Sequence, residues 1–157
     1  MENTRSGMSV GAEGQAADPQ ASGQPDITER LRLAGLRPTR QRLSLGALLF
    51  DGNDRHVTAE MLHEQAVRDS VPVSLATVYN TLHQFTQAGL LREVAVDGAK
   101  SYFDTNTSDH HHFYVEDEQR LVDIEDGDLV VSGLPRAPEG MEITHIDVVV
   151  RVRRTKR

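Results

Sequence analysis

The stretch SLATVYNTLHQFTQAGLL, Ser74–Leu91, determines how the rest of the chain is interpreted. Its apolar residues recur at the spacing of one helix face, at Leu75, Val78, Leu82 and Phe85. This spacing predicts a helix with one buried stripe, which Ser74 can cap at its start and Gly89 can end. The other face carries six side chains that can hydrogen-bond, none of them acidic: Thr77, Tyr79, Asn80, Thr81, Gln84 and Gln87.

Two kinds of helix fit this pattern. A polar face without acids can hydrogen-bond to base edges and phosphates in the major groove of DNA. The same periodicity is also typical of an ordinary amphipathic surface helix, which is the commoner meaning of the pattern taken alone. The remaining sequence has to decide between them.

Composition narrows the class of protein. The chain has 157 residues, of which 38% are hydrophobic, enough for one domain or two small ones. It contains no cysteine, which excludes disulfides and thiolate zinc sites. No apolar run approaches the length of a membrane span, and the first residues lack the apolar core of a signal peptide. We therefore expect a cytoplasmic protein that makes no membrane contact.

The charges are unevenly distributed along the chain. A net charge of −7 argues against binding of nucleic acid by bulk charge. However, arginines gather between residues 30 and 42, and acidic residues gather at 116–118 and 123–128. This distribution favours a basic half that reads DNA and an acidic half that senses a ligand.

The pattern of turns and apolar residues predicts three units. Residues 1–25 are poor in large apolar side chains, so we expect a disordered tail. Residues 26–105 predict a winged helix-turn-helix. Helices at 26–35, 38–51 and 59–68 come before the helix of the Ser74–Leu91 stretch, and a hairpin around Asp97-Gly98 follows it. Residues 106–157 predict short strands at 112–115, 120–124 and 145–152, with 129–131 as a further candidate. The buried side of the helix at 38–51 is expected to carry Leu43, Ala47 and Phe50, and the helix at 59–68 has Met61, Leu62 and Val67 as apolar residues.

The run Asp109-His110-His111-His112 is the segment with the most potential metal ligands in sequence. Side chains alternate along an extended strand, so His110 and His112 should share one face, about 7 Å apart along the backbone. Such a pair can chelate a divalent metal, and Asp109 with His111 would form half of a second site on the other face. The alternative is a run of solvent-exposed loop histidines.

Five segments together resemble the ferric uptake regulator (Fur) family, over about residues 27–152. They are GLRPTRQRLSLGALL (Gly35–Leu49), HVTAEMLHEQ (His56–Gln65), the opening stretch, KSYFD (Lys100–Asp104) and DHHHFYVED (Asp109–Asp117). The resemblance implies an α+β fold, with an N-terminal winged helix-turn-helix DNA-binding domain at 26–105 and a small α/β dimerisation and sensing domain at 106–157. It also implies a homodimeric transcription regulator, a repressor that binds an operator in double-stranded DNA.

The resemblance makes the opening stretch the recognition helix. It implies a base contact for Tyr79 and phosphate contacts for Ser74 and Thr77. Arg40, near the start of the preceding helix, is a further phosphate candidate, with a solvated arginine as the alternative. The family usually has arginine where this chain has Asn80, so the contact at that position should differ.

The resemblance also supplies metal ligands. It implies a regulatory site for Fe²⁺, Mn²⁺ or Zn²⁺ made by His56, Asp104, His110, His112 and Asp123, where the family more often has glutamate at the two carboxylate positions. A weaker second site would use Asp109 and His111, with His145 as a helper. The family's cysteine-bound structural zinc is expected to be lost, because Val115 and Glu118 stand in place of its first cysteine pair.

One branch of the family is the most similar. The lack of cysteine, the DHHHFYVED run and the ending SGLPRAPEGMEITHIDVVVRVRR (residues 132–154) resemble the iron response regulator, Irr, of alphaproteobacteria. This branch implies regulation of iron and haem genes, with haem bound by His110, His111 and His112 and DNA released. The prolines and glycines of the ending predict that the helix which the family places before the last strand is shortened or lost.

Two alternatives to haem sensing remain. The same imidazoles and carboxylates could sense Mn²⁺ or Fe²⁺ directly, because sites without thiolate suit these harder ions. More remotely, His110, His112 and Glu116 have the spacing of a cupin-like metalloenzyme. A cupin needs a sandwich of about eight strands, for which too few residues follow the motif.

Overall fold

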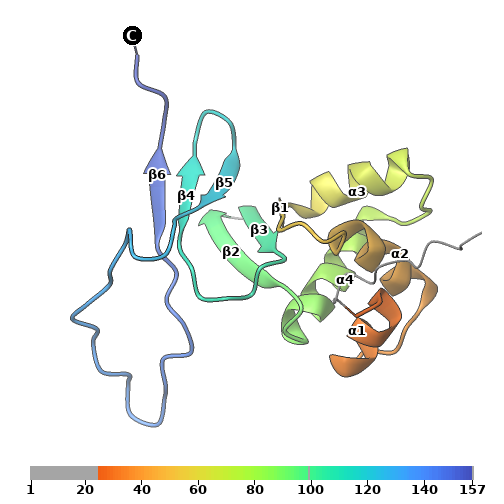
Figure 1. Ribbon diagram of the computed structural model, residues 1–157, viewed down its shortest axis with the longest axis horizontal. Helices are drawn as coiled ribbons and strands as arrows, with labels where there is room; N and C mark the ends of the chain where they lie inside the picture. The colour runs from red at the N-terminus through yellow and green to blue at the C-terminus, as the bar shows by residue number, and fades with distance from the viewer. Residues whose placement is uncertain (1–24, 99, 157) are drawn as a thin grey trace, which may run out of the picture.

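The computed structural model describes residues 25–98 and 100–156 (Figure 1). The predicted disordered tail therefore lies outside the described residues, apart from Pro25. Four helices come first along the chain, interrupted by one short strand, and five strands follow. The helices are α1 (Ile27–Leu33), α2 (Arg40–Leu49), α3 (Ala59–Arg68) and α4 (Leu75–Gln87). The strands are β1 (His56–Val57), β2 (Arg92–Asp97), β3 (Lys100–Asp104), β4 (His112–Val115), β5 (Arg120–Asp123) and β6 (Val149–Val152).

Hydroxyl side chains fix where three of the helices begin. Thr39, Thr58 and Ser74 each accept a hydrogen bond from a backbone N–H in the first turn, at 3.3, 3.2 and 3.1 Å. These bonds satisfy N–H groups that have no partner within the helix. The ends of α3 are those the sequence predicts, and α4 ends before Gly89, whose φ of +79° suits a residue without a side chain.

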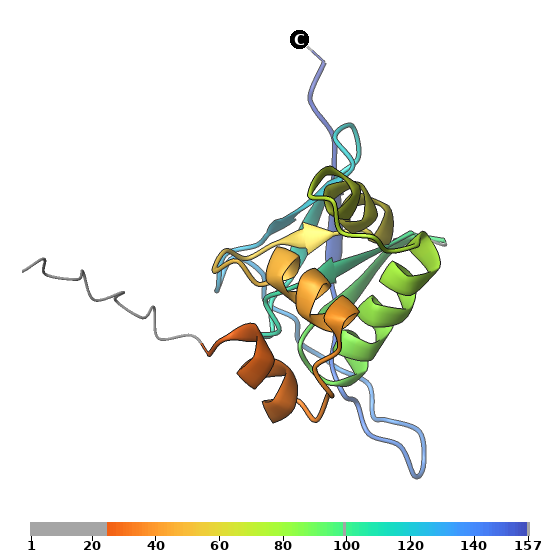
Figure 2. The same cartoon turned by 90° about the vertical axis from the view of Figure 1, so that its right-hand side faces the viewer.

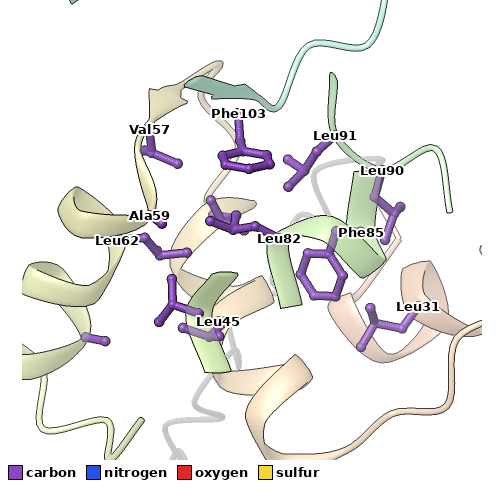
Figure 3. Packing of buried hydrophobic residues seen from close by; sticks show 13 residues of the cluster. Leu31, Leu45, Val57, Ala59, Leu62, Leu82, Phe85, Leu90, Leu91 and Phe103 are labelled. Carbon is purple, nitrogen blue, oxygen red and sulfur yellow. The ribbon is translucent and has the colours of Figure 1, made fainter. Parts of the chain in front are cut away.

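The helices enclose the main hydrophobic core (Figure 3). The apolar stripe of α4 is confirmed for Val78, Leu82 and Phe85, which are fully buried. The stripe turns slightly from the expected direction, because Leu75 is exposed and Thr81 is buried.

α2 buries a different face from the one expected, whereas in α3 the apolar Leu62 is buried between two alanines. The buried residues are Leu45, Gly46 and Leu49 in α2, and Ala59, Leu62 and Ala66 in α3. Leu43 and Phe50 are only partly buried, and Ala47, Met61 and Val67 are exposed. In α2, Gly46 allows α1 to approach closely, since a Cβ on Gly46 would lie 2.5 Å from the Ile27 side chain. This close approach, together with the burial of Leu45 and Leu49, decides which face of α2 is buried.

The strands form two three-stranded sheets. In the first, β3 lies between β1 and β2, which makes β2–β3 the wing predicted around Asp97-Gly98. In the second, β4 lies between β5, its antiparallel neighbour, and β6, its parallel neighbour. Figure 2 shows the helices in front and both sheets behind them.

A second, smaller core joins the two sheets. Val94, Val96 and Tyr102 of the wing pack with Tyr114 and Leu121 of the second sheet. The Tyr102 hydroxyl also donates to the Gln119 carbonyl in the β4–β5 turn, at 2.6 Å. The wing is therefore the element that connects the helical half to the second sheet.

The last third is less regular than the sequence predicts. Residues 129–131 form no strand, and the predicted strand at 145–152 is reduced to β6. The described residues after 105 contain no helix, which confirms that the helix before the last strand is lost, as the prolines and glycines of the ending predict. This part is built from strands and loops and is therefore not the α/β unit that the family resemblance implies. Along residues 25–98 and 100–156, no helix is long and apolar enough to cross a membrane.

Candidate metal centre

Three histidines and two aspartates meet between the two sheets. His56 lies in β1, Asp104 ends β3, His112 begins β4 with His110 two residues before it, and Asp123 ends β5. One ligand atom from each lies within 4.8 Å of all the others. The five residues are those for which the sequence predicts the regulatory site.

Strand pairing explains why these residues meet. The register of β1 with β3 places His56 opposite Asp104, and the register of β4 with β5 places His112 opposite Asp123. Alternation along the chain then places His110 on the same face as His112, two residues away. The site therefore depends on both sheets and on the packing between them (Figure 1).

The spacing of the five atoms fits a metal ion. The Nε2 atoms of His56, His110 and His112 lie 3.1, 2.8 and 2.9 Å from Asp104 Oδ2. The same atoms lie 2.8, 3.2 and 3.3 Å from Asp123 Oδ1. Two ligands at right angles on a metal with bonds of about 2.1 Å are about 3.0 Å apart. The separations are those of neighbouring ligands in one coordination shell.

The cluster is largely withdrawn from water and favours positive charge. Asp104 and His112 are fully buried. Burial alone would raise the pKa of Asp104, but hydrogen bonds from His112 and His56 outweigh it and hold this pKa well below its ordinary value. Burial would likewise lower the pKa of His56, yet Asp104 and Asp123 raise it. The carboxylate of Asp104 thus stays ionised and needs a cation or imidazolium beside it.

The surroundings of His110 orient its Nε2 toward the shared space. Its Nδ1 lies 2.6 Å from the Ser108 carbonyl oxygen, which can only accept, so Nδ1 carries a proton. In a neutral ring Nε2 then has a lone pair, which faces Asp104 Oδ2 at 2.8 Å. A cation held between the two removes this repulsion. Metal-binding histidines commonly have their other nitrogen fixed in this way.

His112 is held from one side only. Among the buried side-chain nitrogen and oxygen atoms of the described residues, its Nδ1 is the one that has no hydrogen-bond partner. The ring is therefore oriented by the cluster itself, through Nε2. Removing a cluster carboxylate should leave this ring without support.

The second predicted site is not assembled. Asp109 points into solvent and approaches Arg92 Nη1 at 3.7 Å. His111 Nδ1 accepts the Val148 N–H at 3.2 Å, and His145 Nε2 lies 3.1 Å from Asp147 Oδ2. Within the part of the chain that the structure describes, the first cluster is the one group of three or more potential ligands. Arg92 also pairs with Asp147, so a fixed positive charge lies where a second cation would bind.

The histidines expected to bind haem offer little open surface. His110 and His112 are buried, and their Nε2 atoms face Asp104. Only His111 is partly exposed, and its Nδ1 is already bonded. The cupin-like alternative is wrong, because Glu116 lies outside the cluster beside Arg151 and the described strands form two small sheets.

The predicted DNA-contacting residues occupy one end of the helical half. Arg40 is exposed at the start of α2, and Tyr79 and Asn80 are exposed on α4. Thr77 is half-buried, and the Ser74 hydroxyl accepts its N–H and donates to its Oγ1 at 3.0 Å. Ser74 therefore acts first as a helix cap.

Arg42, which like Arg40 was a candidate for phosphate contact, is bound to a glutamine on this face, a contact that the sequence did not predict. Arg42 Nε and Nη2 donate to Gln84 Oε1 at 3.2 and 3.1 Å, and Nη1 donates to the Arg37 carbonyl at 2.9 Å. Since a guanidinium only donates, the Gln84 amide must turn its NH₂ group away from Arg42. That group borders a hollow of about 280 Å³ between α2 and α4. Both residues were visible in the sequence, but their contact across 42 positions was not.

Comparison with known proteins agrees with this geometry. The model of the ferric uptake regulator family matches residues 33–151. A ferric uptake regulation protein of Shigella flexneri is 31% identical over 122 residues, which make up 76% of this chain and 82% of that protein. A peroxide-responsive repressor of Staphylococcus aureus is 31% identical over 116 residues, 73% of this chain and 78% of that protein.

A solved structure extends the similarity to the fold. The structure of the ferric uptake regulator from Pseudomonas aeruginosa with manganese has a TM-score of 0.64 at 27% identity, covering 83% of this chain and 98% of that chain. The chain belongs to the ferric uptake regulator family.

Proposed function

We propose that this chain is a homodimeric DNA-binding regulator of iron-related genes whose operator affinity is set by one divalent ion at the His56–Asp104–His110–His112–Asp123 cluster. The observation that carries the proposal is the meeting of five donors from both sheets within 4.8 Å. Each donor atom faces a common space rather than solvent. Membership of a family of DNA-binding transcription regulators supplies the rest.

The donor set favours Fe²⁺ or Mn²⁺. Three imidazole nitrogens and two carboxylates make a shell of five or more ligands without thiolate, which suits these ions better than the four-coordinate shell of structural zinc. The related regulator from Pseudomonas aeruginosa was solved with manganese. The ion would add positive charge that the two carboxylates balance.

The cluster can control DNA binding because it joins two parts of the molecule. His56 and Asp104 belong to the sheet that borders α3, and His112 and Asp123 belong to the second sheet. Without a metal ion, only imidazoles that carry a proton on Nε2 are held to the two carboxylates. An ion that draws them together stabilises one arrangement of the two halves and shifts the population toward it.

Exposed apolar side chains support a homodimer. Val130, Leu134 and Met141 in the long loop before β6 are 82%, 52% and 69% exposed. Two copies related by a twofold axis would cover these side chains and present two α4 helices to successive major grooves.

Haem sensing, as in the iron response regulator branch, is the second hypothesis. It rests on the three adjacent imidazoles of His110–His112. Because two of these rings are buried against Asp104, haem binding would require the cluster to open, and haem would therefore compete with the divalent ion. Replacing all three histidines by alanine should remove any low-spin haem absorbance band and any haem-dependent release of DNA.

Fluorescence anisotropy tests the proposal directly. A duplex selected from a random-sequence pool by the Mn²⁺-loaded protein serves as the operator. We expect addition of Mn²⁺ or Fe²⁺ to tighten binding at least tenfold, about 1.4 kcal/mol, and the His110→Gln variant to lose this gain. Equal affinity with and without every divalent ion would overturn the proposal.

A further inference from the structure

Tyr79, the residue expected to read a base, is held on two sides. Its hydroxyl donates to Glu60 Oε1 of α3 at 2.6 Å. Its ring stacks on His83 one turn later, with centroids 6.5 Å apart and an interplanar angle of 21°. Although Tyr79 is 37% exposed, both the tip and one face of its ring therefore have partners.

Both partners lie close in the chain or in space to cluster residues. Glu60 stands in the first turn of α3, which begins two residues after β1, and β1 carries His56. The His83 ring meets Phe103 edge to face at 5.7 Å and 79°. Phe103 precedes Asp104 in β3 and pairs with Val57 of β1. Two short routes thus run from the candidate metal centre to Tyr79.

A carboxylate at this place calls for an explanation. Glu60 is exposed beside a face expected to approach phosphates, where a negative charge weakens DNA binding. The hydrogen bond from Tyr79 lowers the pKa of Glu60, so the group is an ionised acceptor at neutral pH. A hollow of about 720 Å³ lies between α3, α4 and the wing and gives the Tyr79 ring room to turn if it is released.

We infer that Glu60 is a positioning residue, which holds Tyr79 in its base-reading orientation and relays the state of the metal centre to it. This inference rests on the function proposed above. When a cation fixes His56, it fixes β1 and with it the start of α3, so that Glu60 stays within reach of the Tyr79 hydroxyl. When no cation is bound, the start of α3 is less constrained and the tyrosine is released.

The test uses the full-length chain with two substitutions at one position. Glu60→Ala removes the acceptor, whereas Glu60→Gln keeps an oxygen that can accept from Tyr79 but removes the charge. Calorimetric titration with Mn²⁺ in the absence of DNA should give the same affinity and stoichiometry for both variants and the wild type. Anisotropy on the selected duplex and on a shuffled duplex then compares DNA binding.

We expect Glu60→Ala to bind the selected duplex about tenfold more weakly than the wild type when Mn²⁺ is present, and Glu60→Gln to recover most of the loss. The shuffled duplex should show no such loss. If Glu60 acted only through its charge, both variants would bind both duplexes more tightly and equally, and that result would overturn the inference.

Tyr79→Phe supplies the matched control, because it removes the hydroxyl that Glu60 accepts from. In that background Glu60→Ala should cause no further loss on the selected duplex, whereas additive losses would show that Glu60 acts independently of Tyr79. The outcomes also separate the two proposals. A wild type that ignores Mn²⁺ overturns the proposed function, while a normal Mn²⁺ response in both the wild type and Glu60→Ala overturns only the role of Glu60.

Discussion

The segment Asp109–His112 has two faces, and only one of them has become a candidate metal site. His110 and His112 meet His56, Asp104 and Asp123, which three other strands bring to the same face. Asp109 and His111 lie on the other face, where the described strands bring no such group of ligands to them. Four consecutive residues with metal-binding side chains are thus insufficient, and the partners contributed by distant strands decide which of them can act together.

What occupies the second face explains the difference. His111 accepts a backbone N–H from the segment before β6 and so helps to hold the second sheet together. Arg92 attracts Asp109 and Asp147, which satisfies the carboxylates without a metal. A guanidinium that pairs with two carboxylates neutralises them as a bound metal cation would. Its own positive charge also keeps a metal cation from binding there.

Substituting one aspartate on each face should show the largest contrast. Asp104→Asn removes the buried charge that three imidazoles share, and we expect it to lower the free energy of unfolding in EDTA by about 3 kcal/mol. Asp109→Asn should change it by less than about 0.5 kcal/mol, because Asp109 is exposed. Urea unfolding followed by circular dichroism measures both. Similar losses in the two variants would show that burial of Asp104 is not coupled to the cluster.

The histidines give the same contrast in metal affinity. We expect His110→Gln to weaken Mn²⁺ binding at least about 10–100-fold, since a ligand should matter no less than the groups that orient it. His111→Gln should bind Mn²⁺ as the wild type does. Competition with a fluorescent metal indicator gives both values. Weakening by His111→Gln and none by His110→Gln would reverse the assignment of the faces.

The sequence predicted the helices and the first sheet better than it predicted the last third. The helix caps and the apolar period of α4 are local signals, and the structure confirms them, with Thr58 and Ser74 as caps. The residues buried in α2 were missed, because the close approach of Ile27 to Gly46 is a tertiary contact. The loop from residue 125 to residue 148 was expected to contain a strand, but its apolar residues Val130, Leu134 and Met141 are exposed in the single chain.

The candidate site divides in the same way. The alternation of His110 and His112 follows from strand geometry alone, and the structure places both on one face. Their partners His56 and Asp123 were named only through the family resemblance, because no local pattern joins residues 67 positions apart. The pairing of Arg92 with Asp147 separates the ligands of the second predicted site. No sequence pattern in either segment predicts this pairing.

The pH dependence of stability should reveal the assembled face. His56, with its raised pKa, stabilises the metal-free fold fully below its ordinary value of 6.5, and this contribution is lost as pH rises through the raised value. Asp104 acts in the opposite sense, since its lowered pKa stabilises the fold above its ordinary value of 3.8 and fails only in stronger acid. Metal binding releases protons and strengthens as pH rises.

The melting temperature in EDTA should therefore fall between pH 6 and pH 8, while the increment produced by Mn²⁺ grows. A change of ~1 kcal/mol corresponds to about 2–4 °C for a chain of this size. Differential scanning fluorimetry at a series of pH values, with EDTA or with Mn²⁺, measures the two curves. An increment that stays constant across this range would argue against histidine ligands.

The smallest effect is expected from the unassembled face. His145 is exposed and pairs with Asp147, so His145→Ala should leave one Mn²⁺ per chain and change the free energy of unfolding by less than about 0.5 kcal/mol. Calorimetric stoichiometry and urea unfolding measure both quantities. Loss of a second equivalent of Mn²⁺ in this variant would show that a second site does form in solution.

Pulsed electron paramagnetic resonance on the Mn²⁺-loaded protein tests the central claim most directly, because it counts the nitrogen atoms bound to the ion. With ¹⁵N-labelled histidine side chains, the account predicts three directly bound imidazole nitrogens at one Mn²⁺ per chain, and two in the His110→Gln variant. Mn²⁺ bound only by oxygen, or the same nitrogen count in the variant as in the wild type, would contradict it.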